Sequence, residues 1–173
     1  MPTSTNIGWS AASFSQPGTD TKARAFATKT GDEYAIRQKG VMLAVVDGAI
    51  SASCPDKAAE VAGQALIKTY YSGEAGADPL EALRYAVQHA VLALDGIKEP
   101  GCANLAIALA AVVIRDETVY IARVGDPLVF LSNKDKLLLL TNETVDFDAI
   151  IETGASLQSG DRIVLCTGDF GQA

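Results

Sequence analysis

Four aspartates stand at predicted strand boundaries and could together do chemistry: Asp32, Asp47, Asp126 and Asp169. Asp47 is the most informative, because it and Gly48 end an apolar run. A strand that ends in this way can hold a metal ion, since the strand fixes the carboxylate and the glycine lets a backbone carbonyl come close. Each aspartate alone is better explained as a turn or cap residue. As a group, converging carboxylates repel one another unless a hard divalent cation neutralises them.

The spacing of Asp32 and Asp47 predicts that they meet at one end of a sheet. They lie 15 residues apart in the sequence. We expect a strand over 33–38 that turns at Lys39-Gly40 into a buried strand over 41–46, so that the two form a hairpin. In a hairpin with matched arms, this separation returns the chain so that both carboxylates lie at the same sheet end.

Asp126 and Asp169 occupy comparable positions farther along the chain. Asp126 follows Val124-Gly125 between two predicted strands, and Asp169 follows Gly168 after the last predicted strand. Two metal ions held by aspartate oxygens and water are a common device for hydrolysing phosphate esters. The joint pattern therefore indicates a metal site more strongly than any one aspartate does.

The remaining sequence predicts the elements that must position these residues. Two helices are expected from apolar residues at three- and four-residue spacing, with Pro55 and Asp78-Pro79 at their starts. The order of strands, two helices and then a strand meander predicts an α+β fold with antiparallel sheets. The predicted strands cover 9–14, 24–28, 33–38, 41–46, 106–114, 118–124, 128–131, 136–140 and 162–166, and the predicted helices cover 55–71 and 78–96.

Length and composition restrict the class of protein. The 173 residues suggest a single domain over 1–173, and the net charge of −7 makes general nucleic-acid binding a poor prediction. Cys54, Cys102 and Cys166 are widely spaced and odd in number, so we expect no zinc site or disulfide framework, but buried thiols in a reducing compartment. Without a secretory N-terminus or an apolar run near 18 residues, we expect a cytoplasmic protein that does not span a membrane.

Several segments resemble motifs of one family, the PP2C-type metal-dependent protein phosphatases, including their short bacterial members. The resemblance covers roughly 31–170, and its most specific parts are Val124–Leu131 and Leu157–Thr167. Thr30–Tyr34 and Val45–Gly48 resemble the first two aspartate motifs of the family. The resemblance implies a four-layer α-β-β-α sandwich, in which two antiparallel sheets are flanked by helices and metals lie in the cleft between the sheet ends.

The resemblance also implies an activity and a set of ligands. The reaction is hydrolysis of phosphoserine or phosphothreonine in proteins by a water bound to Mg²⁺ or Mn²⁺, with no catalytic side chain beyond the metal-bound water. Carried over by position, Asp47 bridges two ions, the Gly48 carbonyl binds one of them, and Asp32 acts directly or through water. Asp126 lies near a third, weaker ion, and Asp169 stands at the family's second Asp-Gly. No phosphate-binding residue and no oligomeric state are predicted.

A catalytically inactive member, acting as a regulatory protein-binding module, is the alternative hypothesis. Ile50 stands where the family has glycine, and Gly168-Asp169 reverses the order of the second Asp-Gly. The sequence stops at Ala173, so we expect the closing helix and strand of the family, with a last metal-binding aspartate, to be missing. Loss of one member of a carboxylate cage can remove most of its metal affinity.

Overall fold

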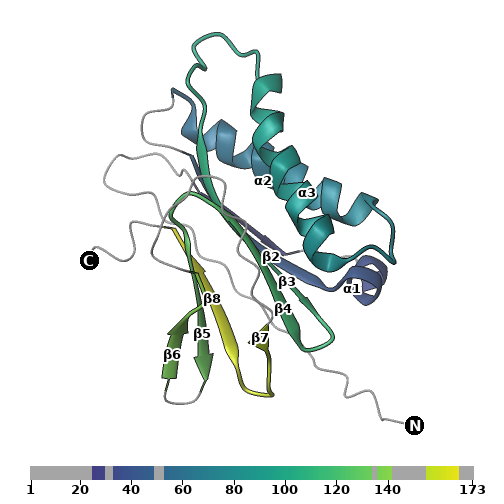
Figure 1. Cartoon of the computed structure of the whole chain (residues 1–173). Helices are drawn as coiled ribbons and strands as arrows, with labels where there is room; N and C mark the ends of the chain where they lie inside the picture. Colours follow the sequence, from purple (N-terminus) through teal and green to yellow (C-terminus); the bar gives the residue numbers. More distant parts are fainter. Residues whose placement is uncertain (1–24, 30–32, 49–52, 134–135, 142–154, 168–173) are drawn as a thin grey trace.

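The fold consists of two antiparallel sheets with a layer of helices on one side (Figure 1). The computed structural model describes residues 25–29, 33–48, 53–133, 136–141 and 155–167. The predicted strand over 9–14 lies outside this described part of the chain. None of the described helices is long and apolar enough to cross a membrane.

The larger sheet has five strands in the order β1-β2-β3-β4-β7. These strands are β1 (Ala25–Lys29), β2 (Val41–Gly48), β3 (Ile107–Arg115), β4 (Thr118–Val124) and β7 (Ala155–Ser156), and each neighbouring pair is antiparallel. The apolar run over 106–114 becomes the central strand β3, which is buried over most of its length. The prediction of a strand buried on both faces is confirmed.

The smaller sheet has three strands in the order β6-β5-β8. They are β5 (Leu128–Asn133), β6 (Lys136–Leu139) and β8 (Arg162–Cys166), again all antiparallel. Val129 of β5 packs with Val112 and Ile121 in one buried cluster, which joins the two sheets. The outer face of this sheet carries the exposed side chains of Leu137, Leu139 and Val164.

Two long helices cover the opposite face of the larger sheet (Figure 1). They are α2 (Pro55–Ser72) and α3 (Pro79–Leu92), and a short 3₁₀ helix, η1 (Ala93–Gly96), follows α3. Leu66 of α2 and Leu83 of α3 pack on Val46 of β2 in a second buried cluster. Asp78 caps α3 as predicted, because its side chain accepts hydrogen bonds from two backbone N–H groups of the first turn, each at 3.0 Å. This arrangement confirms the predicted α+β fold with two antiparallel sheets.

The predicted strand over 33–38 was wrong, because this segment is the helix α1 (Glu33–Lys39). Most of its residues are good helix formers, and Ile36 is its one β-branched residue. Gly40 ends the helix with a positive φ of 89° and donates a hydrogen bond of 2.8 Å to the Ile36 carbonyl. A Cβ at Gly40 would also fall 2.4 Å from the carbonyl oxygen of Ile114, so only glycine fits this turn into β2.

Candidate functional site

Asp47 lies between the two sheets at the end of β2. Side chains alternate along a strand, and Val46 packs under the helices. Val45 packs instead against the cluster that joins the sheets. Asp47 lies on the same face of β2 as Val45, is half-buried and is the second-to-last residue of the strand. Its carboxylate therefore stands on the inter-sheet side, as a metal ligand in a cleft would.

Asp126 reaches the same end of the sheet two strands away. Asp47 pairs with Ala108 of β3, and a Cβ at Gly125 would lie 3.1 Å from the Ala108 Cβ. These three residues therefore form one row across β2, β3 and the end of β4, and Asp126 follows directly. Two strand spacings of about 4.8 Å put roughly 10 Å between the outer backbones of this row. The structure thus places Asp47 and the exposed Asp126 on either side of β3, at one end of the strands of the larger sheet. We call this end of the sheet the site edge.

Strand β8 also ends at this edge. Cys166 pairs with Leu128 of β5, which lies two residues after Asp126. Thr167 is the last described residue beyond β8. Asp169 itself lies outside the described residues, so its assignment as a ligand stays a prediction.

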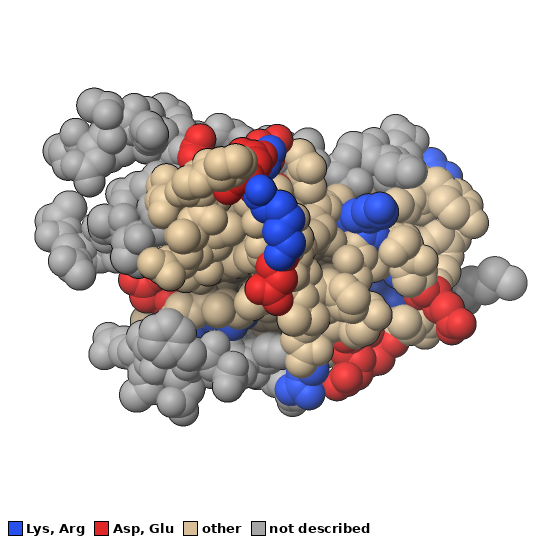
Figure 2. Space-filling model, turned by 90° about the horizontal axis from the view of Figure 1, so that it is seen from above, with Lys and Arg blue, Asp and Glu red and all other residues tan. Residues whose placement is uncertain are grey.

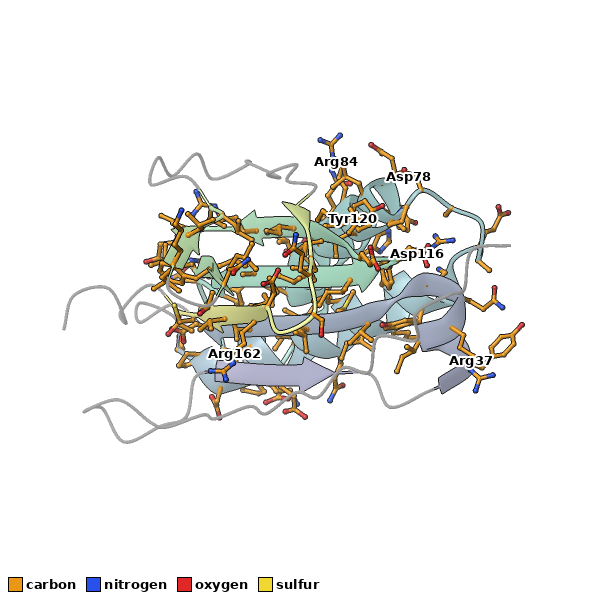
Figure 3. The ribbon with its side chains drawn as sticks, turned by 90° about the horizontal axis from the view of Figure 1, so that it is seen from below. Arg37, Asp78, Arg84, Asp116, Tyr120 and Arg162 are labelled. Carbon is orange, nitrogen blue, oxygen red and sulfur yellow. A yellow bond between two sulfur atoms is a disulfide. The ribbon has the colours of Figure 1, made fainter. Side chains whose placement is uncertain are left out.

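The hairpin that linked Asp32 to Asp47 does not form. The partner of β2 is β1, in which Ala25 pairs with Asp47 and Lys29 pairs with Leu43. The chain therefore runs along β1 away from Asp47. It returns through α1 to Val41, near the turn between β3 and β4, where Arg37 and Asp116 lie at one end of the molecule (Figure 3). Asp32 lies outside the described residues, so its assignment as a ligand stays a prediction.

Gly48 has a packing role that is independent of metal binding. It pairs with Ile107 in the ladder between β2 and β3. On its other side, a Cβ would fall 2.0 Å from the carbonyl oxygen of Pro55, the first residue of α2. Glycine is therefore required for the helix to start against the strand, and the role of the Gly48 carbonyl as a ligand stays a prediction.

Arg123 is a charged residue of the site that the sequence analysis missed. It is only 2% exposed and lies on the inter-sheet face of β4, in alternation with Val119 and Ile121. Burial lowers the pKa of its guanidinium, while the negative charge of Asp126 acts in the opposite direction. The sequence signal was this alternation, in which Arg123 takes the place of a third buried apolar side chain.

The residues described at this edge do not make a complete ligand cage. Within the described ranges, no three His, Cys, Asp or Glu side chains come together as a group that could hold a metal ion. Oxygen donors from Asp47, Gly48 and Asp126 nevertheless have the hard character that Mg²⁺ and Mn²⁺ prefer. The donor chemistry of these three residues therefore fits such an ion.

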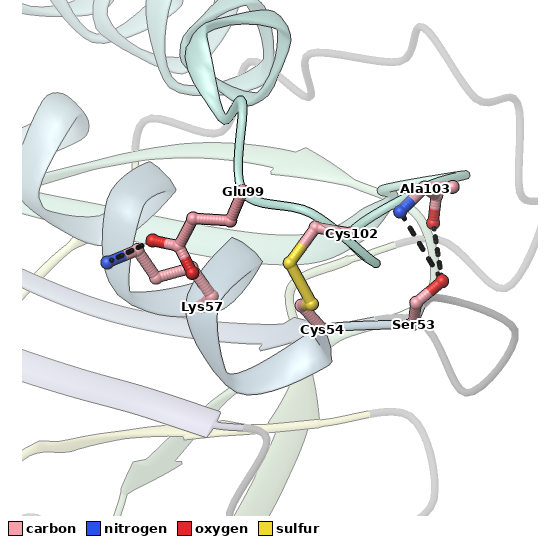
Figure 4. The surroundings of a disulfide bond; sticks show 6 residues. All are labelled: Ser53, Cys54, Lys57, Glu99, Cys102 and Ala103. Carbon is pink, nitrogen blue, oxygen red and sulfur yellow. Dashed lines mark hydrogen bonds and ion pairs between the residues drawn. A yellow bond between two sulfur atoms is a disulfide. The ribbon is translucent and has the colours of Figure 1, made fainter.

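A disulfide bond between Cys54 and Cys102 lies beside the site and corrects the prediction of free thiols (Figure 4). The two cysteines are 48 residues apart, so their spacing gave no sign of pairing. The β2–β3 ladder brings them together, because it pairs Gly48 with Ile107 and so places the start of α2 beside the segment that enters β3. Cys166 is free and half-buried, and burial raises the pKa of its thiol.

Two further interactions run parallel to the disulfide (Figure 4). The Ser53 hydroxyl donates to the Ala103 carbonyl at 3.2 Å and accepts from the Ala103 N–H at 3.3 Å. Lys57 and Glu99 form an ion pair of 3.1 Å. We call residues 53–57 and 99–103 the clasp. It ties the first turn of α2, which Gly48 contacts, to the segment leading into β3.

The charged side chains on the helical side of the molecule do not segregate by sign. On the face seen in Figure 2, described acidic and basic side chains alternate over the surface. Arg84 and Glu81 of α3 are one exposed example, with 3.6 Å between their charged groups. This face offers no single-sign patch among the described residues.

Comparisons with known proteins agree on one family. The sequence matches the family model of protein phosphatase 2C over residues 25–158. No curated protein matches the sequence. Among solved structures, the serine/threonine phosphatase PstP of Mycobacterium tuberculosis is 18% identical, with a TM-score of 0.60 over 83% of this chain and 76% of that one.

Two other phosphatases share the fold over a smaller part of their length. The PPM phosphatase MsPP of Mycobacterium smegmatis has a TM-score of 0.57 and 19% identity, over 76% of this chain and 51% of that chain. Stp1 of Staphylococcus aureus has a TM-score of 0.61 and 16% identity, over 74% of this chain and 51% of that chain. The chain thus spans about half of each of these two proteins. At such identities the likeness concerns the fold.

Proposed function

Because the chain belongs to the protein phosphatase 2C family, we propose that it is a divalent-metal-dependent phosphatase of phosphoserine and phosphothreonine in proteins. The observation that carries this proposal is the convergence of Asp47 and Asp126 at one edge of the larger sheet, where β8 also ends. We treat residues 1–173 as one domain that contains this site.

The proposed ligands are oxygen donors from separate elements. Asp47 and the Gly48 carbonyl come from β2, Asp126 comes from the connection between β4 and β5, and Asp169 follows β8. The catalytic domain of PstP has been solved with 2 manganese ions, which supports the choice of metal. A divalent cation bound here would supply a water of lowered pKa as the nucleophile for attack on phosphorus. Asp32, which lies outside the described residues, stays a further predicted ligand.

Asp47 and Asp126 differ in their surroundings. The backbone of Asp47 is held by ladders to β1 and β3 on both sides, so the residue is positioned before any ligand arrives. Asp126 is exposed and follows Gly125, whose positive φ of 78° turns the chain out of β4. The side of the site at Asp126 is therefore open to solvent, and a phosphorylated side chain can approach from there.

Release of phosphate from a phosphothreonine peptide tests this function. We expect the full chain to show Mn²⁺-dependent hydrolysis, and Asp47→Asn to lower kcat/KM by about 100-fold. Asp116→Asn is the matched control, because Asp116 lies in the turn at the other end of the sheet, with a positive φ of 49° that asparagine tolerates. An inactive wild-type chain with ample Mn²⁺, or an active Asp47→Asn variant, would contradict the proposal.

A catalytically inactive regulatory module is the second candidate. It is favoured by the buried positive charge of Arg123 beside the proposed ligands and by the incomplete ligand cage among the described residues. Such a module would bind a phosphoprotein without hydrolysing it. Stoichiometric binding of a phosphothreonine peptide without phosphate release, in the presence of millimolar Mn²⁺, would favour this candidate over the enzyme.

A further inference from the structure

Arg123 is a buried charge that the proposed reaction does not use. Lys39 is the other charged side chain among the described residues that is buried. Lys39 lies at the opposite end of β2, where its ammonium group donates a hydrogen bond of 2.5 Å to the Tyr70 carbonyl at the end of α2. Its position is explained by that helix end, which attracts a cation. Arg123 stands instead beside the candidate site, on the inter-sheet face of β4.

The strand register places Arg123 in the row of inter-sheet side chains that neighbours the row of the proposed ligand Asp47. Arg123 pairs with Ala110 of β3, and Ala110 pairs with Val45 of β2. The next row on the same face of the sheet, toward the end of β2, contains Asp47 and Ala108. Ala108 and Ala110 carry only methyl groups, so the inter-sheet face between Arg123 and Asp47 is lined by small side chains. Arg123 and Asp47 thus lie on the same face of the larger sheet. Asp126 follows three residues after Arg123, just beyond the end of β4.

The charge of this side chain has a direct consequence for metal binding. A guanidinium stays protonated at any pH at which the protein is folded. A buried charge is unfavourable unless anions compensate it. The negative charge of Asp126 acts on Arg123, as the opposing effect on its pKa shows. A divalent cation placed among the same carboxylates would meet repulsion from this fixed charge, and low-dielectric surroundings strengthen that repulsion.

We propose that Arg123 is a built-in positive charge of the candidate site, which balances the carboxylates at this edge and lowers their affinity for divalent cations. The proposal rests on the metal site of the proposed function and adds a determinant of its affinity. Arg123 is a positioning residue, because it acts through the carboxylates and not on the substrate. The site then binds a divalent cation only at high metal concentration. Without metal, the charge of Arg123 compensates the negative charge of the carboxylates.

Isothermal titration of Mn²⁺ into the full chain and three variants tests this role. Arg123→Gln removes the charge and keeps polar atoms, and Arg123→Lys keeps the charge. Arg162→Gln changes the net charge equally at an exposed position of β8 (labelled in Figure 3), whose neighbour Ile163 faces the other way, into the inter-sheet cluster. Circular dichroism melting of each variant identifies the temperature range in which it is folded, and the titrations are run there.

We expect Arg123→Gln to bind Mn²⁺ at least about tenfold more tightly than the wild type. Arg123→Lys and Arg162→Gln should stay within about twofold of the wild type, because both leave the buried charge in place. A merely structural role of Arg123 would lower the melting temperature of Arg123→Gln without raising its affinity for Mn²⁺, and would overturn the proposal.

The remaining outcomes separate this proposal from the proposed function. If the wild type binds Mn²⁺ and Arg123→Gln binds it equally or more weakly, the role of Arg123 is wrong and the metal site stands. If neither protein binds Mn²⁺, both proposals fail. Inorganic phosphate is titrated in parallel. Loss of phosphate binding in Arg123→Gln, with unchanged affinity for Mn²⁺, would make Arg123 a substrate ligand and overturn the role in metal affinity.

Discussion

Gly48 lies directly against Pro55, so that a Cβ at Gly48 would fall 2.0 Å from the Pro55 carbonyl oxygen. The contact joins the end of β2, which carries the proposed ligands, to the first residue of α2. The helix start therefore has no room to move closer to the strand end. The candidate site depends on this close approach of two backbones.

Gly48→Ala should destabilise the protein, because backbone atoms of Pro55 cannot yield as a flexible side chain could. We expect a loss of roughly 2 kcal/mol or more in the free energy of unfolding, measured by urea denaturation. Gly76→Ala is the control, since nothing lies within 4 Å of a Cβ at that position. It should change stability by no more than about 0.5 kcal/mol. Equal stability of the two variants would contradict the packing described here.

The clasp should contribute strongly to stability through its disulfide. Closing a loop of 48 residues is worth about 4 kcal/mol in the chain-entropy account of disulfides. The double variant Cys54→Ser with Cys102→Ser should therefore melt well below the wild type. Thiol titration in denaturant should find one reactive thiol per chain, that of Cys166, before reduction and three afterwards. Three reactive thiols before reduction would show that the bond is absent.

Tyr71 should stabilise the junction of α1 and β2. Its hydroxyl donates to the Gly40 carbonyl at 2.9 Å and accepts from the Met42 N–H at 3.0 Å. Tyr71→Phe leaves both backbone groups without this partner and should cost about 1–3 kcal/mol in urea denaturation. Tyr85→Phe, at an exposed position of α3, should change stability by less than about 0.5 kcal/mol.

The same region should weaken in alkali. Burial raises the pKa of Tyr70 to about 12 and also raises that of Tyr71. As pH rises above 10, the phenols lose their protons in the unfolded chain before they do so in the folded one. The stability that the protonated phenols contribute is therefore complete below pH 10 and is lost as pH rises through the folded pKa. Lys39 acts in the opposite direction, because burial and Arg115 lower its pKa. With two phenols against one amine, stability in urea should fall from pH 10 to pH 11.5 on balance, and less steeply in Tyr71→Phe. A rise over this range would contradict the assignment.

Local patterns were sufficient for most of the fold. The apolar run that ends in Asp47, the helix starts at Pro55 and Asp78, and the strands from β3 to β6 all follow from neighbouring residues. The segment over 33–39 failed because its alternation was too short to outweigh helix propensity and the glycine cap at Gly40.

The parts that could not be predicted depend on pairing across the fold. The register of β1 on β2 decides which residues stand near Asp47, and the spacing to Asp32 contained no information about it. The bond between Cys54 and Cys102 forms because the β2–β3 ladder brings two distant loops together. Arg123 could be assigned to the site only from the structure, because the packing of Val119 and Ile121 shows which face of β4 lies between the two sheets.

Titration of Mn²⁺ into the wild type, Asp47→Asn and Asp126→Asn by calorimetry tests the central claim most directly. The account predicts saturable binding in the wild type, loss of that binding in Asp47→Asn, and weaker binding in Asp126→Asn, because both carboxylates lie at one edge of the sheet. Asp116→Asn should bind as the wild type does. Undiminished binding of Mn²⁺ by Asp47→Asn, or no binding by the wild type, would contradict the account.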